Sequence, residues 1–435
     1  MSKQPSPTLK KVLKPVHLWS LAVGLVISGE YFGWNYGWQA AGTIGFLIAT
    51  LIVTVLYITF IFSFTELTTF IPQAGGPFAF AEKAFGPLGG LIAGYATLTE
   101  FVLAPPAIAL ALGSYTHFLY PALQVMHVAV ACYVIFTFIN LLGIKESAVF
   151  TLIVTVLAVA ELSLFIGIVS PHFQWNNFIK DGMPFGAKGI FAALPFAIWF
   201  YLGIEGVAMV AEEVIDPQKN IPKGYIWGLV TLIILALAVM LATGGLTDWH
   251  LLSNIDYPLP ESISIVLGKT NSFTKLFAGI GLFGLIASFH GLMVGYSREI
   301  YALSREKLLP PFLSNVNRKF QTPHWALIAG AVIGLLSLFT GTTDKVITVS
   351  ALGAVLMYAV SMLSLLQMKS KRIMQSTSFK TPCYPWFPVI ALLLSFVCLI
   401  AIIGYNLLLS IIFFSGLIIL IIIFIILGKH KKTES

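Results

Sequence analysis

The stretch ISGEYFGWN, residues 27–35, lies inside an apolar run that otherwise has the composition of a membrane span. It contains two glycines, and it places Glu30 among apolar neighbours. Glycine weakens a helix by roughly 1 kcal/mol relative to alanine. A carboxylate in hydrocarbon is costly unless it is paired, protonated or facing water. We therefore expect a local break in this helix and a functional role for Glu30, the alternative being a protonated glutamate that caps freed carbonyl groups.

The composition around this stretch is that of an all-α polytopic membrane protein. Hydrophobic residues make up 58% of the 435 residues and charged residues 10%, against roughly 25% charged in soluble domains. A span needs about 20 apolar residues, and LSIIFFSGLIILIIIFIIL at 409–427 is a charge-free example. Lipid offers backbone groups no partners, so such runs must be helical. Twelve transmembrane helices are expected near 17–37, 42–70, 88–119, 127–143, 147–169, 187–211, 224–246, 274–302, 324–340, 346–368, 386–405 and 408–427.

The basic residues predict the orientation of these spans. With twelve spans and a cytoplasmic start, only five of the 25 Lys and Arg fall on the outer side, as the positive-inside rule requires. The expected N-terminal tail, 1–15, and C-terminal tail, 429–435, are then both cytoplasmic. The net charge of +7 is explained by this topology and by contact with anionic lipid. Nothing in the pattern calls for nucleic acid as a partner.

The sixth expected span has the same peculiarity as the first. LPFAIWFYLGIEGVAMVAEE, residues 194–213, contains Pro195, Gly203 and Gly206 around Glu205. Interrupted helices at matching positions of two halves are the sequence sign of an inverted-repeat transporter. The expected division is 16–170 for spans 1–5, 186–370 for spans 6–10 and 385–428 for spans 11 and 12. The alternative is that the glycines serve only close helix packing.

Motifs of other function classes are absent from the sequence. Cys132, Cys383 and Cys398 have neither disulfide nor metal-ligand spacing, and the eight histidines show no His-x-x-x-His pair. No GxxxxGK[ST] phosphate loop is present. We therefore expect no metal, no cofactor and no enzymatic activity.

Three longer motifs resemble one superfamily. They are FTELTTFIPQAGGPFAFAEKAFGPLGG at 64–90, AEEVIDPQKNIPKG at 211–224 and SREIYALSREKLLPPFLSNVNRKFQTPHWAL at 297–327. They are similar to signature segments of amino acid-polyamine-organocation permeases, and the resemblance covers about residues 15 to 370. Within that superfamily, SGEYFGWNYGW at 28–38 and FAIWFYLGIEGVAMVAEE at 196–213 resemble the bacterial ethanolamine permease group most closely.

This resemblance implies the fold of the bacterial leucine transporter, a five-plus-five inverted repeat with broken helices 1 and 6, in a bacterial inner membrane. It also implies a substrate held midway across the membrane. Ser28 and Gly29 match the unwound first span of the family, Trp199 an aromatic gate, and Glu205 a glutamate linked to gating and proton coupling. The chain departs from amino acid permeases at Glu30, where they have an apolar residue. A carboxylate there would repel a substrate carboxylate, which favours an amine that lacks an acid group.

Other residues in the spans have narrower expected roles. Glu100 precedes a Pro-Pro kink and could reach the central cavity, whereas Glu66 suits a gate or structural anchor and Glu161 a partner across helices. Arg298 belongs to an expected cytoplasmic gate network. Aromatic rings near the breaks can bind an ammonium group through cation–π contact. The expected substrate site comprises Ser28, Gly29, Glu30, Tyr31, Glu100, Trp199, Tyr201, Gly203 and Glu205.

The sequence thus predicts a secondary active transporter of ethanolamine or a similar small primary amine, working by alternating access. The coupling ion stays open: the lysine that some proton-driven relatives carry in the fifth span is replaced by Ala158, and Ser288 could serve a sodium ion. The nearest alternative is a proton-coupled permease for neutral or cationic amino acids. A transporter-like amine sensor is an alternative from a different class. The sequence gives no indication of oligomeric state.

Overall fold

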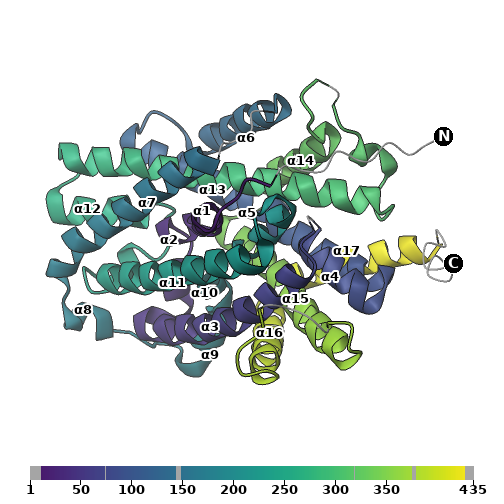
Figure 1. Cartoon of the computed structure of the whole chain (residues 1–435). Helices are drawn as coiled ribbons and strands as arrows, with labels where there is room; N and C mark the ends of the chain where they lie inside the picture. The colour runs from purple at the N-terminus through teal and green to yellow at the C-terminus, as the bar shows by residue number, and fades with distance from the viewer. Residues whose placement is uncertain (1–10, 74, 144–147, 318, 375–378, 427–435) are drawn as a thin grey trace.

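The computed structural model describes residues 11–73, 75–143, 148–317, 319–374 and 379–426. Over these residues the chain is helical, and its only β-type pairing is an isolated bridge between Leu13 and Val214. Figure 1 shows most of the long helices lying roughly side by side in one bundle. The helices are α1 (Pro15–Val26), α2 (Ser28–Tyr31), α3 (Tyr36–Phe70), α4 (Gly76–Phe85), α5 (Pro87–Leu119), α6 (Val125–Leu141), α7 (Ala148–Val169), η1 (Ser170–His172), α8 (Trp175–Ile179), α9 (Gly186–Ala192), α10 (Leu194–Trp199), η2 (Ile204–Glu213), α11 (Pro217–Gly244), η3 (Trp249–Leu251), α12 (Pro258–Leu267), α13 (Ser272–Arg305), η4 (Pro311–Ser314), α14 (His324–Thr340), α15 (Thr343–Ser370), α16 (Trp386–Tyr405) and α17 (Leu407–Ile426).

Nine helical segments in the described part of the chain are long and apolar enough to cross a membrane. They confirm a polytopic helical membrane protein. The spans predicted near 17–37, 127–143 and 324–340 correspond to shorter apolar helices, α1 with α2, α6 and α14. Twelve crossings, the five-plus-five repeat and the division of the chain at 16–170, 186–370 and 385–428 therefore stay predictions. Residues 1–10 of the predicted N-terminal tail and the whole predicted C-terminal tail lie outside the described residues.

The helix ends meet in two groups. At the side expected to face the cytoplasm, the backbone N–H of Val12, before α1, donates to the carbonyl of Glu213 at the end of η2 (2.9 Å). Lys369, near the end of α15, reaches Glu66 near the end of α3. At the opposite side, the N–H of Gly45 donates to the carbonyl of Gly182, which precedes α9 (2.9 Å). The start of α3 therefore lies beside the start of the segment formed by α9, α10 and η2, which corresponds to the sixth predicted span.

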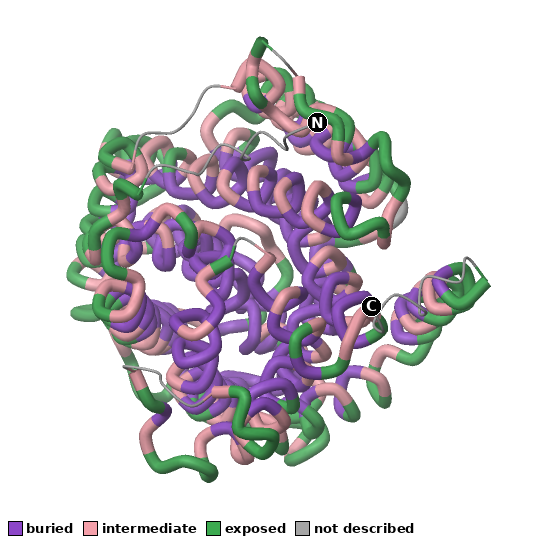
Figure 2. Tube along the Cα trace, turned by 45° about the vertical axis from the view of Figure 1, so that its right-hand side comes forward, coloured by how far each residue is buried: buried purple, intermediate pink, exposed green. Residues whose placement is uncertain are grey.

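The centre of the bundle is buried and its outer surface is apolar. Figure 2 shows buried residues concentrated in the interior and exposed ones at the periphery. Large apolar side chains on the outermost helices are exposed, including Ile400 and Leu408. Such a surface is expected where a helix faces lipid rather than water. The fully buried interior contains the two broken segments and their glutamates.

Candidate functional site: two broken helices in contact

The first predicted break is present. Helix α1 ends at Val26, Ile27 interrupts it, and α2 continues for only four residues. Phe32 is then extended, and Gly33 has a φ of +90°. That left-handed conformation is one that glycine adopts without steric cost. The chain therefore changes direction beside Glu30.

The second predicted break is also present. Helix α10 ends at Trp199, and four residues later Gly203 has a φ of +100°. The segment that follows, η2, has 3₁₀ geometry over ten residues, longer than such helices usually run. Pro195 lies in the first turn of α10, a position where proline is compatible with a helix. Gly203 therefore marks this break, and Pro195 does not.

The two breaks touch each other. A Cβ added to Gly29 would lie 2.4 Å from the carbonyl oxygen of Trp199 and 3.3 Å from the Cα of Phe200. The indole N–H of Trp199 donates to the carbonyl of Phe32 across the same contact (3.0 Å). The rings of Phe32 and Trp199 meet edge to face, with centroids 5.7 Å apart. Only a residue without a side chain at position 29 permits this approach.

Glu30 is buried at this junction without a hydrogen-bond donor. Its side chain has no solvent exposure, and neither carboxyl oxygen has a hydrogen-bond partner within the described part of the chain. Aromatic residues surround its backbone: the indole of Trp34 donates to the Glu30 carbonyl (3.1 Å) and stacks on Phe200. The Glu30 carboxyl also acts electrostatically on the phenol of Tyr201. An unpaired buried carboxyl group is a site for a cation or a proton.

Ser28 connects the first break to α13. Its hydroxyl lies 2.8 Å from the hydroxyl of Ser288, which in turn donates to the carbonyl of Leu25 (2.6 Å). The Ser288 hydroxyl therefore satisfies a carbonyl at the end of α1. Ser288, considered above as a residue that could serve a sodium ion, thus lies beside the first break.

Tyr31 points to a different neighbour. Its hydroxyl donates to the carboxyl of Glu161 in α7 (2.7 Å), and its ring lies against Gly284 of α13. The hydroxyl of Tyr115 donates to the Tyr31 carbonyl (3.1 Å). Glu161 thus has the cross-helix partner that was expected for it. The Tyr31 hydroxyl, by contrast, binds α7, so a role for it in holding substrate stays a prediction.

Glu100 of α5 and Glu205 of η2 form a second acidic cluster. Both are fully buried, and their carboxyl groups interact directly. The second oxygen of Glu205 lies 3.5 Å from the hydroxyl of Tyr358, which is 2.6 Å from the hydroxyl of Tyr57. Among the residues that the structure describes, neither oxygen of Glu100 accepts a hydrogen bond of normal geometry, although the backbone N–H of Gly203 approaches this carboxyl group. The cluster therefore lacks the donors that two charged carboxylates would need.

Three tyrosines that contact one another are influenced by the two acidic regions. The hydroxyl of Tyr201 is 2.8 Å from that of Thr54, and its ring centroid is 4.9 Å from that of Tyr57. Tyr57 also contacts Tyr358 edge to face. Glu30 acts electrostatically on Tyr201, whereas Glu100 and Glu205 act on Tyr57 and Tyr358. We call Tyr57, Tyr201 and Tyr358 the tyrosine wall.

Comparison with known proteins identifies the family of the chain. An amino acid permease family model matches residues 13–405. The chain belongs to the amino acid permease family. An uncharacterized transporter of Rhizobium meliloti is 30% identical over 85% of this permease and 82% of its own length. The branched-chain amino acid permease BcaP of Bacillus subtilis is 27% identical (98% and 95%), and a methylthioribose transporter of the same organism is 26% identical (90% and 88%).

Membership in this family fixes the general activity. The permease is a multi-pass membrane transporter for a small molecule, an amino acid or a similar compound, and proteins of this family are transporters rather than enzymes. The superfamily resemblance read from the motifs at 64–90, 211–224 and 297–327 is thereby confirmed. The narrower likeness to ethanolamine permeases stays a prediction.

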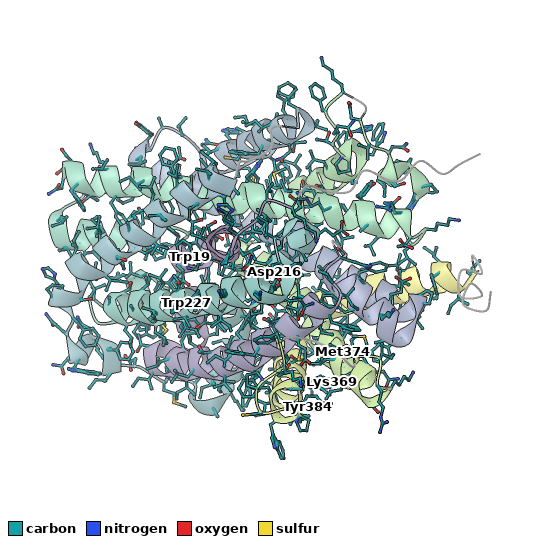
Figure 3. All side chains as sticks on the ribbon, in the orientation of Figure 1. Trp19, Asp216, Trp227, Lys369, Met374 and Tyr384 are labelled. Atoms are coloured by element: carbon teal, nitrogen blue, oxygen red, sulfur yellow. The ribbon has the colours of Figure 1, made fainter. Side chains whose placement is uncertain are left out.

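Glu66 and Arg298, for which gate or anchor roles were predicted, lie near helix ends. Glu66 binds the ammonium group of Lys369 (2.8 Å) and accepts from the backbone N–H of Thr381 (2.9 Å). Lys369 also lies over the ring of Tyr384, 4.0 Å from its centroid, and Figure 3 shows these two residues together near the end of α15. Arg298 lies 3.5 Å from Glu213 at the end of η2. Both pairs lie near helix ends, and the gate or anchor roles predicted for Glu66 and Arg298 stay predictions.

Some residues of the site carried no sequence signal. Tyr57 and Tyr358 are tyrosines within long apolar helices, where nothing in the local sequence marks them, and Thr54 and Tyr115 are equally inconspicuous. Asn35 ends the quoted stretch, and its amide donates to the carbonyls of Leu252 (2.7 Å) and Ile255 (2.8 Å). A buried asparagine in a span is a signal that could have predicted such a link.

Proposed function

We propose that this permease is a secondary active transporter that carries ethanolamine or a similar small primary amine by alternating access in a bacterial inner membrane. The observation that carries the proposal is Glu30, a fully buried carboxyl group without a hydrogen-bond donor at the contact of the two breaks. Transport of a zwitterionic substrate gives no reason for an unpaired buried carboxyl group. A cationic substrate does, because it would pair with that group.

The electrostatic argument concerns the charge of the guest. Removing a carboxylate from water is costly, and a nearby opposite charge offsets that cost strongly where water is excluded. A primary ammonium group beside Glu30 would supply that charge together with three N–H donors. A zwitterion would bring its own carboxylate to the same place. Glu30 would therefore favour an amine over an amino acid of the same size.

The neighbours of Glu30 provide the remaining contacts that a small amine needs. Trp34, Trp199 and Tyr201 present aromatic rings around the break, and a ring face near an ammonium group contributes roughly 0.5–2 kcal/mol. The backbone at Ser28, Gly29 and Gly203 would bind the amine or hydroxyl group. Trp199 would act as the gate, because its hydrogen bond to Phe32 joins the two broken segments.

The second candidate is a proton-coupled permease for neutral or cationic amino acids. Family membership favours it, as does the similarity to a branched-chain amino acid permease. Competition separates the two candidates. Inhibition of radiolabelled ethanolamine uptake by other short amines but not by alanine supports the amine proposal. Binding of alanine or arginine in preference to ethanolamine supports the alternative.

The amine proposal is tested by Glu30→Gln in proteoliposomes. The substitution keeps the size of the side chain and removes its charge, so ethanolamine uptake should fall to the level of empty liposomes while the thermal unfolding temperature stays close to that of the wild type. Glu299→Gln is the matched control, because Glu299 in α13 is also buried with both oxygens unpartnered. Normal uptake by Glu30→Gln would refute the role of Glu30.

A further inference from the structure

The loop between α15 and α16 is fastened to the end of α3 by one buried carboxylate. The ammonium group of Lys369 lies 2.8 Å from Oε2 of Glu66. The same oxygen accepts hydrogen bonds from the backbone N–H of Thr381 (2.9 Å) and from its hydroxyl (2.6 Å). Glu66 and Thr381 are both buried. Because residues 369 and 381 bind one oxygen atom, the two limbs of the loop next to them are brought together.

Three basic side chains project from these two limbs. Lys371 and Arg372 directly follow Lys369 in the sequence, and all are at the end of α15. Lys380 directly precedes Thr381 on the other limb. The backbone N–H groups of Lys371 and Arg372 donate to carbonyls in the last turn of α15 (both 3.0 Å), so this limb has a defined path. Since the three side chains are exposed, the loop presents three positive charges from one small region.

These positive charges have no carboxylate to compensate them. Residues 345–433 contain no aspartate and no glutamate. Within the described part of the chain, no carboxylate of another element forms an ion pair with Lys371, Arg372 or Lys380, and Glu66 is buried and already paired. Neighbouring like charges repel one another. An anion bound between the three side chains would therefore stabilise the loop.

The loop lies at the level expected for lipid head groups. Helix α16 has 20 residues, about 30 Å at 1.5 Å per residue, which matches the hydrocarbon core of a bilayer. Its first and last residues, Trp386 and Tyr405, are both exposed, and such aromatic residues gather at the two membrane interfaces. Tyr384, over whose ring Lys369 lies (Figure 3), belongs to the same interface. The basic residues that precede Trp386 are thus placed among the head groups.

An exposed apolar stripe begins at this interface and follows α16 into the membrane. Trp386, Leu393 and Ile400 are 67%, 58% and 69% exposed. Their spacing of seven residues is close to two helical turns, so they lie on one face of the helix. Figure 1 shows α16 at the edge of the bundle. An acyl chain can therefore lie along this face, directly below the three cations.

We propose that Lys371, Arg372 and Lys380 bind the phosphate group of an anionic phospholipid whose acyl chain lies along the exposed face of α16. Lysine and arginine form charge-assisted hydrogen bonds with phosphate oxygens, and arginine can donate two at once. The site goes beyond a general attraction of basic loops to the membrane, because it requires these three side chains together. It concerns the bilayer and not the transported substrate, so it holds or fails independently of the amine proposal.

A lipid titration of the purified protein in detergent tests the site. Dioleoyl phosphatidylglycerol should raise the thermal unfolding temperature, because a ligand of the folded protein stabilises it. Phosphatidylcholine with the same chains should not. In the triple variant Lys371→Gln, Arg372→Gln and Lys380→Gln, the affinity for phosphatidylglycerol should fall on the order of 100-fold, about five-fold for each cation. Native mass spectrometry counts the bound lipid, so a variant of lower stability still gives an answer.

The triple variant Lys11→Gln, Lys223→Gln and Lys319→Gln is the matched control. These lysines are exposed and lie outside α15, α16 and the loop between them, and none forms an ion pair with a described residue. The same net charge is lost, but exposed charges farther apart than about 8 Å are largely screened at physiological ionic strength. Binding of phosphatidylglycerol should therefore stay close to that of the wild type. Equal losses in the two triple variants, or none in the first, would overturn the proposal.

Glycerol 3-phosphate distinguishes a lipid from a soluble phosphate compound. It carries a phosphate group but no acyl chain, so it cannot use the exposed face of α16. At the concentration at which phosphatidylglycerol saturates the wild type, it should leave the unfolding temperature unchanged. An increase equal to that from phosphatidylglycerol would make this a site for soluble phosphate and overturn the proposal. An equal increase from phosphatidylcholine would do the same, because the negative head group would then have no part in binding.

Discussion

Gly29 is the residue at which the two broken segments come closest. Because an added Cβ would lie 2.4 Å from a backbone oxygen of Trp199, the clash cannot be relieved by rotating a side chain. Gly29→Ala should therefore separate the breaks, lower the stability of the conformation in which they touch by about 1–3 kcal/mol and abolish most substrate uptake. Thermal unfolding in detergent and proteoliposome uptake measure the two effects.

Gly279 provides the control for that substitution. It lies within α13, and no atom of the residues that the structure describes lies within 4 Å of an added Cβ. Gly279→Ala should leave uptake intact and raise stability by roughly 0.5–1 kcal/mol, because alanine restricts the unfolded chain more than glycine does. If Gly29→Ala behaved like Gly279→Ala, the close contact between the breaks would have no part in transport.

Trp199 joins the breaks through one hydrogen bond. Trp199→Phe keeps an aromatic ring and removes the donor to the Phe32 carbonyl, a loss worth about 1 kcal/mol when the partner stays buried. We expect the conformation in which the two breaks touch to be less populated, so that bound substrate leaves faster. This is measured as a higher KM for uptake and a faster release of preloaded label.

Trp19→Phe is the matched control for Trp199→Phe. The indole of Trp19 in α1 donates to the hydroxyl of Thr231 in α11 at the same distance, 3.0 Å, and Figure 3 shows Trp19 apart from the α15 end where Lys369 and Tyr384 lie. The two substitutions remove the same type of bond. Equal effects of both on KM would mean that Trp199 has a structural role and no gating role.

At the scale of elements, the positions of the breaks follow from local sequence, whereas the directions of the side chains do not. Gly33 and Gly203 have the positive φ values that make glycine necessary, so their segments could be predicted as unwound. Tyr31 lies next to the break, where the chain is no longer a regular helix. Helical periodicity therefore could not predict which neighbouring helix its side chain contacts. Tyr57 and Tyr358 meet across 301 positions of sequence. No local pattern encodes such a contact.

The segment between η3 and α12 connects the starts of two long helices. Asp256 in this segment accepts from the hydroxyl of Tyr36 at the start of α3 (2.7 Å) and from that of Thr343 at the start of α15 (3.0 Å). Burial raises the pKa of Asp256 to about 6, with a smaller contribution from the charge of Asp344. This pKa lies above the value of about 3.9 for an unfolded chain.

The raised pKa predicts the sign of a pH effect on stability. Between pH 4 and 6 the folded form binds more protons at Asp256 than the unfolded form does, so stability is gained as the pH falls through about 6. Because Asp256 is half-buried as a residue, we expect a gain in stability of about 1–2 kcal/mol rather than the full value of the shift. Thermal unfolding at pH 7.5 and pH 5 measures this gain.

Asp256→Asn isolates the contribution of this carboxyl group. The amide keeps an acceptor for one of the two hydroxyl donors and cannot titrate, so the gain in unfolding temperature at low pH should shrink. Asp344→Asn removes a neighbouring charge without removing the titrating group, and most of the gain should persist. A pH dependence unchanged in Asp256→Asn would show that other groups produce it.

For the whole molecule, the number of crossings decides where the ends of the chain lie. The nine long segments alone would give an odd number of crossings and ends on opposite sides. Adding α1 with α2, α6 and α14, but not the ten-residue α12, gives twelve crossings and ends on one side. Helices α6 and α14 have 17 residues each, about 26 Å at 1.5 Å per residue, which is slightly less than the hydrocarbon core of about 30 Å.

The packing of the short helices favours twelve crossings. Helix α6 returns along α5: a Cβ at Gly113, near the end of α5, would lie 2.4 Å from the carbonyl of Val125 at the start of α6. The end of α6 meets the start of α14, where the hydroxyl of Thr322 donates to the carbonyl of Leu141 (3.3 Å). Because α5 is long enough to cross and α6 runs back beside it, α6 should cross as well.

Reporter fusions test this topology. Green fluorescent protein fused after residue 435 should fluoresce, because it folds in the cytoplasm, and alkaline phosphatase fused there should be inactive. Alkaline phosphatase fused after His250, in the loop following α11, should be active, since this loop lies at the opposite end of the bundle. The lysines near the start of the chain favour a cytoplasmic N-terminus. An active phosphatase at residue 435 would put the two ends on opposite sides and exclude twelve crossings, because an even number cannot separate them.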